Sequence, residues 1–188
     1  MALGVVIKQA RSAVKNYVIL LRGVTRTGKN RVPMVELRTA LRNAALLDVQ
    51  TYIQSGNVVA KSRLDQSSIQ SLVHEIIARE IGADIAVIAR THDQLKHVLE
   101  DIPFPQTAAS RTYFSLLAAP PASHLIDDLR QLDFSPGGVK VIGNTIYTLY
   151  ATKHRDSKFN NNFFERKLRV TATTRNFNTM SRLVELSS

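Results

Sequence analysis

The sequence Val49-Gln-Thr-Tyr-Ile-Gln-Ser-Gly-Asn-Val-Val-Ala60 contains two short apolar strands, 49–53 and 57–60, on either side of Ser55-Gly56. A glycine turn between two such strands is typical of a β-hairpin. A nucleotide-binding α/β fold would have a helical crossover at this point in the chain. The hairpin therefore indicates an antiparallel sheet rather than a parallel one.

The segments around this hairpin complete one structural unit. Residues 17–21 are apolar on both faces, which fits a central buried strand. Pro33 stands where the first residue of a helix is expected, and apolar residues follow at helical spacing. Residues 69–77 repeat that helical pattern, with Gly82 as its stop, and residues 84–89 form a last strand. This order predicts a ferredoxin-like (split βαβ) subdomain.

The second half of the chain repeats the pattern less regularly. The expected elements are a helix over 91–99, a linker over 102–106, a strand over 113–117, a helix over 123–132, strands over 139–142 and 145–150 around Gly143-Asn144, and helices over 157–168 and 174–186. The predicted fold class is α+β, with two ferredoxin-like subdomains and an extra C-terminal helix. The predicted domains are a basic N-terminal extension over 1–16 and subdomains over 17–100 and 101–188.

The composition excludes several classes of protein. With 188 residues and 44% hydrophobic residues, the chain can bury a core and is not disordered. The absence of cysteine excludes disulfides, zinc-thiolate sites, iron-sulfur clusters and cysteine nucleophiles, and it fits a reducing compartment. No apolar run approaches the roughly 18 residues of a membrane helix. We therefore expect a soluble, cytoplasmic protein with no membrane partner.

The positive charge lies at the two ends of the sequence. The formal net charge is +10, and the balance of basic over acidic residues is +7 in 1–60, −2 in 61–150 and +5 in 151–188. If folding joins the two ends, the resulting surface would attract phosphates or nucleic acid. The alternative is that the excess of Lys and Arg only keeps the protein soluble.

Residues 23–30, Gly-Val-Thr-Arg-Thr-Gly-Lys-Asn, come within one residue of a phosphate-loop motif. Asn30 lacks the hydroxyl that would bind magnesium, and the predicted helix starts several residues late. The loop remains a candidate for anion binding through Arg22, Arg26 and Lys29. The five histidines do not cluster, so no metal site is predicted, and no catalytic residue or cofactor is assigned.

The C-terminal stretch 171–179 gathers hydroxyl, amide and guanidinium groups around a predicted helix start near Thr173. One threonine would suffice to cap the helix. The remaining polar groups, beside free N–H groups, would suit an anion. Ser157-Lys158 repeats this chemistry at the preceding helix. Capping and ligand binding both remain open.

Several motifs resemble one bacterial family. They are Leu21-Arg-Gly23, Gly28-Lys-Asn-Arg-Val-Pro-Met34, Thr51-Tyr-Ile-Gln-Ser-Gly-Asn-Val58, Ser157-Lys158, Glu165-Arg-Lys-Leu168 and Ala172-Thr-Thr-Arg-Asn176. This set, spread over residues 17–186, resembles the proteins grouped as domain of unknown function 1697. The resemblance implies a pair of ferredoxin-like subdomains and no established biochemical role. Thr25-Arg26-Thr27 and Phe177 depart from the pattern of that family.

The expected function is binding of a phosphate-bearing or other anionic small ligand in a positive pocket formed by both ends of the chain. The candidate ligand-binding residues are Arg22, Lys29, Asn30, Gln54, Ser55, Asn57, Lys158, Thr173, Thr174, Arg175, Asn176 and Asn178. One alternative is an enzyme, a transferase or hydrolase, that acts on a phosphorylated substrate. Another is nucleic-acid binding with little sequence preference, because the aromatic residues of RNA-recognition strands are absent. The sequence assigns no oligomeric state.

Overall fold

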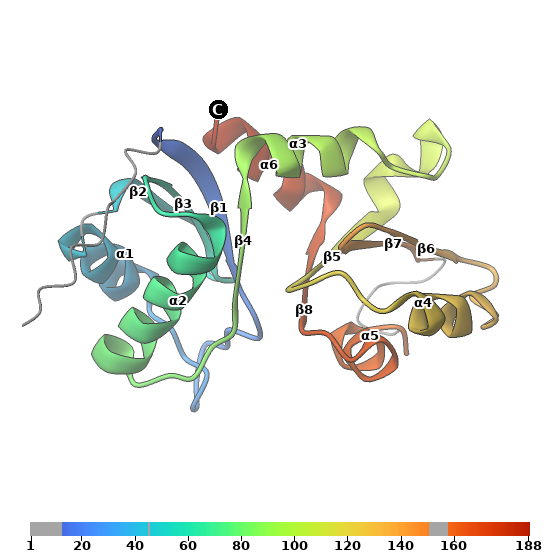
Figure 1. Ribbon diagram of the computed structural model, residues 1–188, viewed down its shortest axis with the longest axis horizontal. Coiled ribbons are helices and arrows are strands. Elements are labelled where there is room, and N and C mark those ends of the chain that lie inside the picture. Colours follow the sequence, from blue (N-terminus) through green and yellow to red (C-terminus); the bar gives the residue numbers. More distant parts are fainter. Residues whose placement is uncertain (1–12, 45, 151–157) are drawn as a thin grey trace, which may run out of the picture.

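The computed structural model describes residues 13–44, 46–150 and 158–188 and shows two sheets, each with its own helices (Figure 1). The first half consists of β1 (Lys15–Leu21), α1 (Met34–Asn43), β2 (Leu47–Tyr52), β3 (Asn57–Ser62), α2 (Gln66–Ile76) and β4 (Val87–Thr91). Its antiparallel sheet has the order β2-β3-β1-β4, which is the ferredoxin-like arrangement. A π-helical turn extends α2 to Ile81, and Gly82 ends it with a left-handed φ of 77°.

The second half has the same topology. It consists of α3 (His92–Glu100), a 3-10 segment (Gln106–Arg111), β5 (Thr112–Leu117), α4 (Ser123–Arg130), β6 (Gly138–Ile142), β7 (Thr145–Leu149), α5 (Asn161–Leu168), β8 (Ala172–Asn176) and α6 (Phe177–Leu186). Its sheet order is β6-β7-β5-β8, with every pair antiparallel. The predicted fold class is confirmed: the protein is α+β, with two similar subdomains and a C-terminal helix.

The sequence-based boundaries are wrong in several places, most of all before α6. The predicted helix over 174–186 begins at Phe177, and the residues before it form β8, the fourth strand of the second sheet. Threonine is β-branched and favours strands, so its cap-like chemistry misled the prediction. The helix predicted over 157–168 begins at Asn161, and Ser157 lies outside the described residues. Pro33 precedes α1 instead of starting it.

Two further boundaries shift at strands. The strand predicted over 84–89 is β4, which begins at Val87. The basic extension predicted over 1–16 lies mostly outside the described residues, and β1 already begins at Lys15.

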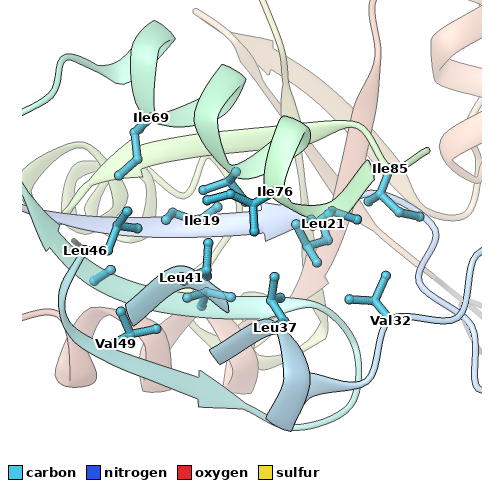
Figure 2. Packing of buried hydrophobic residues seen from close by; sticks show 14 of the residues in the cluster. Ile19, Leu21, Val32, Leu37, Leu41, Leu46, Val49, Ile69, Ile76 and Ile85 are labelled. Carbon is cyan, nitrogen blue, oxygen red and sulfur yellow. The ribbon is translucent and has the colours of Figure 1, made fainter. Parts of the chain in front are cut away.

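Three apolar cores hold the layers together. The first lies between α1, α2 and the outer face of the first sheet, where Ile19, Leu37 and Ile76 are buried (Figure 2). The second lies between the two sheets and includes side chains of α3 and α6, such as Leu95 and Met180. The third lies between the second sheet, α4 and α5. The middle core joins both halves, and β4 and β8 both lie near the centre of the molecule (Figure 1).

The two halves are equivalent residue by residue around β4 and β8. Arg90 pairs with Val18 of β1, and Arg175 pairs with Phe114 of β5. The residue after each arginine, Thr91 or Asn176, caps the following helix by accepting a hydrogen bond from a main-chain N–H. The fold therefore places a buried arginine at the same position of each half.

Candidate functional site

Arg175 is the centre of a polar contact between the two halves. Its side chain projects from β8 and is almost fully buried, with the whole residue 9% exposed. Nε donates to Asn57 Oδ1 at 2.5 Å, and Nη1 donates to Thr173 Oγ1 and to the main-chain oxygen of Thr174, both at 2.9 Å. Nη2 donates to the main-chain oxygens of Leu21, Ser55 and Gly56, each at 3.1 Å.

These bonds define what we call the Arg175 seam, the contact of Arg175 and Thr173 with Leu21, Asn57 and the turn between β2 and β3. A guanidinium has five N–H donors, and here all of them have acceptors. Burial lowers the pKa of Arg175 to about 10, so the group stays charged at neutral pH. The donors of Arg175 are therefore all used within the protein, and its role as a ligand anchor stays a prediction.

Gly56 is needed where the turn meets the seam. It has a φ of 75°, and a Cβ there would lie 2.7 Å from Leu21 Cβ. Its main-chain oxygen accepts from the N–H of Leu21 at 2.8 Å as well as from Arg175. Asn57, fully buried, also donates from Nδ2 to Tyr52 O and to Ser55 Oγ. Three successive residues at this turn, Ser55, Gly56 and Asn57, thus accept hydrogen bonds from the guanidinium of Arg175.

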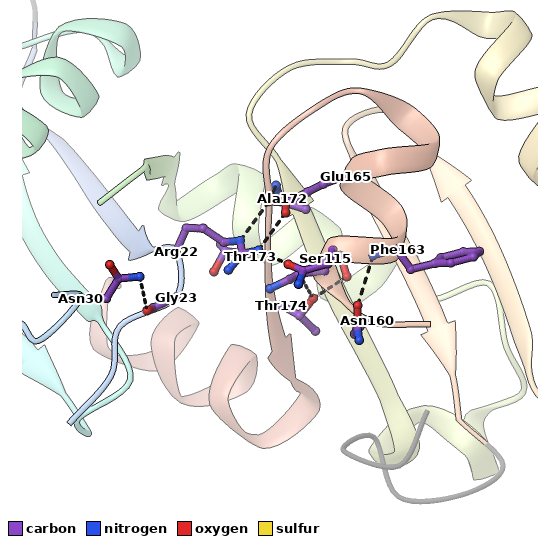
Figure 3. Close-up of polar contacts among 12 residues, drawn as sticks. Arg22, Gly23, Asn30, Ser115, Asn160, Phe163, Glu165, Ala172, Thr173 and Thr174 are labelled. Carbon is purple, nitrogen blue, oxygen red and sulfur yellow. Dashed lines mark hydrogen bonds and ion pairs between the residues drawn. The ribbon is translucent and has the colours of Figure 1, made fainter. Parts of the chain in front are cut away.

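Arg22 makes a second contact between the halves, next to the seam (Figure 3). Nε and Nη2 donate to the two carboxylate oxygens of Glu165 at 2.9 and 2.8 Å, and Nη2 also donates to Asn162 Oδ1 at 2.6 Å. Glu165 accepts in addition from the N–H of Ala172. Burial alone would raise the pKa of Glu165, but these hydrogen bonds and the charge of Arg22 outweigh it and hold the pKa below its usual range. Arg22 is therefore an ion-pair partner of Glu165, and its role as an anion ligand stays a prediction.

The hydroxyls of β8 are also engaged. Thr173 Oγ1 donates to Leu21 O at 3.2 Å. Thr174 Oγ1 donates to Asn161 Oδ1 and contacts Ser115 Oγ, both at 2.6 Å. Asn176 accepts from the N–H of Thr179 as the N-cap of α6. Of the two interpretations of this stretch, the capping role is thus observed, although at Asn176 rather than at a threonine.

The other predicted site residues make contacts outside the seam. Gln54 Nε2 donates to Val32 O, and Lys158 Nζ lies 5.2 Å from the ring centroid of Phe159. Asn30 Nδ2 donates to Gly23 O, and Asn178 is exposed on α6. The structure therefore brings the two ends of the sequence together, as the prediction required, but the residues that meet bind one another.

Loop 23–31 carries the positive groups that remain outside this contact. The N–H of Thr25 donates to Asn30 O, and the N–H of Arg31 donates to Gly28 O, both at 3.0 Å. Gly28 has a φ of 79°, and a Cβ there would meet no atom within 4 Å. The side chains of Arg26, Lys29 and Arg31 are exposed, and within the described part of the chain no carboxylate pairs with them. This loop is therefore braced and cationic.

Sequence reasoning missed the residues that contact Arg22 and Thr174. Glu165, Asn161 and Asn162 lie on α5, and Ser115 lies on β5. One signal could have indicated Glu165. It is the only acidic residue in 157–184, a segment with several basic residues, so an ion pair with one of the many cations of the chain could be expected. Arg90 gave no signal, since its burial depends on how the sheets pack.

Arg90 mirrors Arg175 in the other half. It is 1% exposed, and its Nη1 and Nη2 donate to the main-chain oxygens of Ala89 and Leu117 at 2.8 and 2.5 Å. Leu117 ends β5 as Leu21 ends β1. Each half therefore sends one arginine to the strand end of the other. Within residues 13–44, 46–150 and 158–188, the Nε of Arg90, unlike that of Arg175, has no hydrogen-bond partner.

Two ferredoxin-like halves joined by reciprocal arginines define the class as a tandem ferredoxin-like α+β protein. The chain belongs to the family described as protein of unknown function (DUF1697), which matches residues 14–147. Its structure is similar to that of the conserved bacterial protein SP0830 from Streptococcus pneumoniae, with a TM-score of 0.71 and 21% identity over 94% of this chain and 100% of that chain. No curated protein matches the sequence. Among the described residues, no helix is long and apolar enough to cross a membrane.

Proposed function

We propose that this protein binds a phosphate-bearing ligand on loop 23–31, through Arg26, Lys29 and Arg31. The observation that carries the proposal is a braced loop that holds three exposed cations and no acidic residue. Arginine can contact a phosphate through two N–H groups, and lysine supplies a point charge. A fixed loop loses less conformational entropy on binding than a flexible one.

The position of the loop supports a binding role rather than a phosphate-loop reaction. In a phosphate-loop enzyme the helix starts at the lysine, so that its N–H groups face the phosphates. Here α1 begins only at Met34, after Pro33. Glu165 of α5 pairs with Arg22, the residue that precedes the loop. This pairing keeps the carboxylate ionised, so Glu165 has no proton to donate at neutral pH. No observation on the described residues favours the enzyme alternative.

Isothermal titration with pyrophosphate, AMP and ATP tests the proposal at low ionic strength. We expect saturable binding of at least one of these probes. The variant Lys29→Glu should weaken it at least tenfold, whereas Lys167→Glu, an exposed change of the same charge on α5, should leave it within twofold. If none of the probes binds the wild-type protein, or if both variants weaken binding equally, the loop is not the site.

Nucleic acid is a second candidate ligand, favoured by the continuation of charge from the loop onto α1. Arg38 and Arg42 follow Arg31 and are four residues apart, so they share one face of α1. An open row of cations suits a phosphate backbone and predicts little sequence preference and a steep salt dependence. Filter binding with a labelled single-stranded DNA separates the two ligands. Binding of the DNA at low salt without binding of AMP or ATP would favour the nucleic acid.

The cellular compartment belongs to the same proposal. A cysteine-free chain fits a reducing compartment, and phosphorylated metabolites and nucleic acids are abundant ligands there. We therefore propose that the protein acts in the cytoplasm.

A further inference from the structure

The two halves differ at the groove beside the outer strand of each sheet. In the second half, the chain that leaves α3 crosses the inner face of the sheet. Tyr147 of β7 donates its hydroxyl to Val98 O of α3 at 3.1 Å. The ring of Phe104 then lies against Gly138 of β6, so that a Cβ on this glycine would be 3.0 Å from Phe104 Cε1. Ile102 and Phe104 pack against the middle core, so this linker covers the groove with apolar side chains.

The corresponding place in the first half is open. Helix α6 contacts β3, as α3 contacts β7 through the hydrogen bond from Tyr147 to Val98. Beside it lies a groove of about 310 Å³, whose lining includes Asn16, Gln50, Val59, Lys61 and Leu186. Val59 pairs with Gln50 in the first sheet, and Tyr147 pairs with Lys140 in the second, so Val59 is the counterpart of Tyr147. The groove therefore occupies the position that the linker covers in the other half. Among the lining residues none is an aromatic side chain comparable to Phe104.

An exposed leucine marks the same position. Leu47 pairs with Lys61 in the first sheet, and Gly138 pairs with Leu149 in the second, which makes Leu47 the counterpart of Gly138. Leu47 is 52% exposed. Leu47 pairs with Lys61 and directly precedes Asp48, and both of these residues line the groove, so Leu47 lies at its margin. The groove thus has an apolar rim where its counterpart holds an aromatic ring.

The charges around the groove complement those of the linker that fills its counterpart. Arg42 and Lys61 contribute two positive side chains to the lining, and Asp48 contributes one negative side chain. The Lys61–Asp48 pair is 2.8 Å long but largely exposed, so it is weak and open to rearrangement. In the linker, Glu100 and Asp101 directly precede the apolar sequence Ile-Pro-Phe-Pro.

We propose that this groove docks an extended peptide segment of a partner protein, in which an acidic residue precedes a proline-flanked aromatic one. The aromatic ring covers Leu47 and Val59, as Phe104 covers Gly138 in the second half. The acidic residue lies beside Arg42 and Lys61. Proline restricts the free peptide, so it loses little entropy when it binds. The groove is separate from loop 23–31, and the proposal stands without the phosphate ligand.

Fluorescence polarisation with a labelled peptide Glu-Asp-Ile-Pro-Phe-Pro-Gln, the sequence of residues 100–106, tests the proposal on the full chain. We expect saturable binding that falls at least fivefold with Leu47→Asp, with Lys61→Glu, and when Phe in the peptide is replaced by Ala. Val35→Asp, a change at an exposed residue at the other end of α1, should bind like the wild type. All three variants replace exposed or half-buried side chains, and thermal unfolding confirms that each is folded.

Amide chemical shifts locate the bound peptide. We expect changes at Gln50 and Lys61. Changes confined to Gly138 and Tyr147 would mean that the probe displaces the linker of the protein itself, which would overturn the proposal. Absence of saturable binding, or equal binding by Leu47→Asp and the wild type, would also overturn it.

Discussion

Arg175 donates from Nη2 to the main-chain oxygen of Leu21 at 3.1 Å, across the boundary between the two halves of the protein. Neither residue belongs to the sheet of the other. Because the guanidinium is buried and all its donors have acceptors within the protein, this contact joins the two halves. The proposed phosphate site is therefore assigned to the cations that lie outside it.

Replacement of Arg175 by alanine should destabilise the whole protein. The change leaves the carbonyls of Leu21, Ser55 and Gly56 without this donor inside the seam, and we expect a loss of about 3 kcal/mol in the free energy of unfolding. Urea denaturation measures it, with Arg166→Ala, an exposed change on α5, as the control. A loss of less than about 1 kcal/mol for Arg175→Ala would show that the seam contributes little.

Replacement of Thr145 by asparagine should stabilise the protein through Arg90. Asn57 accepts a hydrogen bond from Arg175 Nε. Asn57 pairs with Leu20 in the first sheet, and Thr145 pairs with Leu116 in the second, so Thr145 is the counterpart of Asn57. An asparagine there would give the unpartnered Nε of Arg90 an acceptor, and we expect a gain of about 1 kcal/mol. The gain should vanish in an Arg90→Met background. An equal effect in both backgrounds would contradict this explanation.

Replacement of Ile53 by asparagine should also raise stability. Ile53 has a φ of 49° in the turn between β2 and β3, a left-handed conformation that β-branched side chains rarely adopt. Its side chain is 53% exposed, so little burial is lost. We expect a gain of about 1 kcal/mol in urea denaturation, because asparagine tolerates this conformation better. A decrease in stability would indicate that the contacts of the isoleucine side chain stabilise the protein by more than its backbone conformation destabilises it.

The ion pair of Arg22 and Glu165 should make stability depend on acid pH. The folded pKa of Glu165 lies below that of the unfolded chain, so its contribution is complete above the unfolded pKa, about 4.3, and is lost as pH falls through the folded value. The wild type should therefore lose more stability than Glu165→Gln between about pH 5 and pH 3. Urea denaturation at a series of pH values measures the difference. Parallel curves for the two proteins would show that the pair does not contribute.

Local patterns in the sequence were sufficient to predict most of the fold. The hairpin around Ser55-Gly56 and the helical stripes predict both ferredoxin-like halves, because each depends on neighbouring residues. Strand β8 was not predicted, because its sequence is polar. Its polar residues Thr173 and Arg175 form hydrogen bonds with Leu21 and Asn57 of the other half. Local sequence does not show a contact between Thr173 and Leu21, which are 152 positions apart.

The candidate site was predicted in part for the same reason. The sequence shows that charge gathers at both ends, and the structure shows that the ends meet. The sequence does not show that Arg22 pairs with a carboxylate, or that the donors of Arg175 all have acceptors, because these contacts depend on tertiary packing. Lys29 and Arg26, both predicted as candidates for anion binding, are exposed in the loop, so the phosphate proposal now depends on them.

Titration of the isotope-labelled protein with pyrophosphate, followed through its amide chemical shifts, tests the central claim most directly. We predict saturable changes at the amides of loop 23–31, above all at Gly28 and Lys29, and none at Arg175. Saturable changes at Arg175 and Asn57 with an unaffected loop would contradict the account and return the site to the seam.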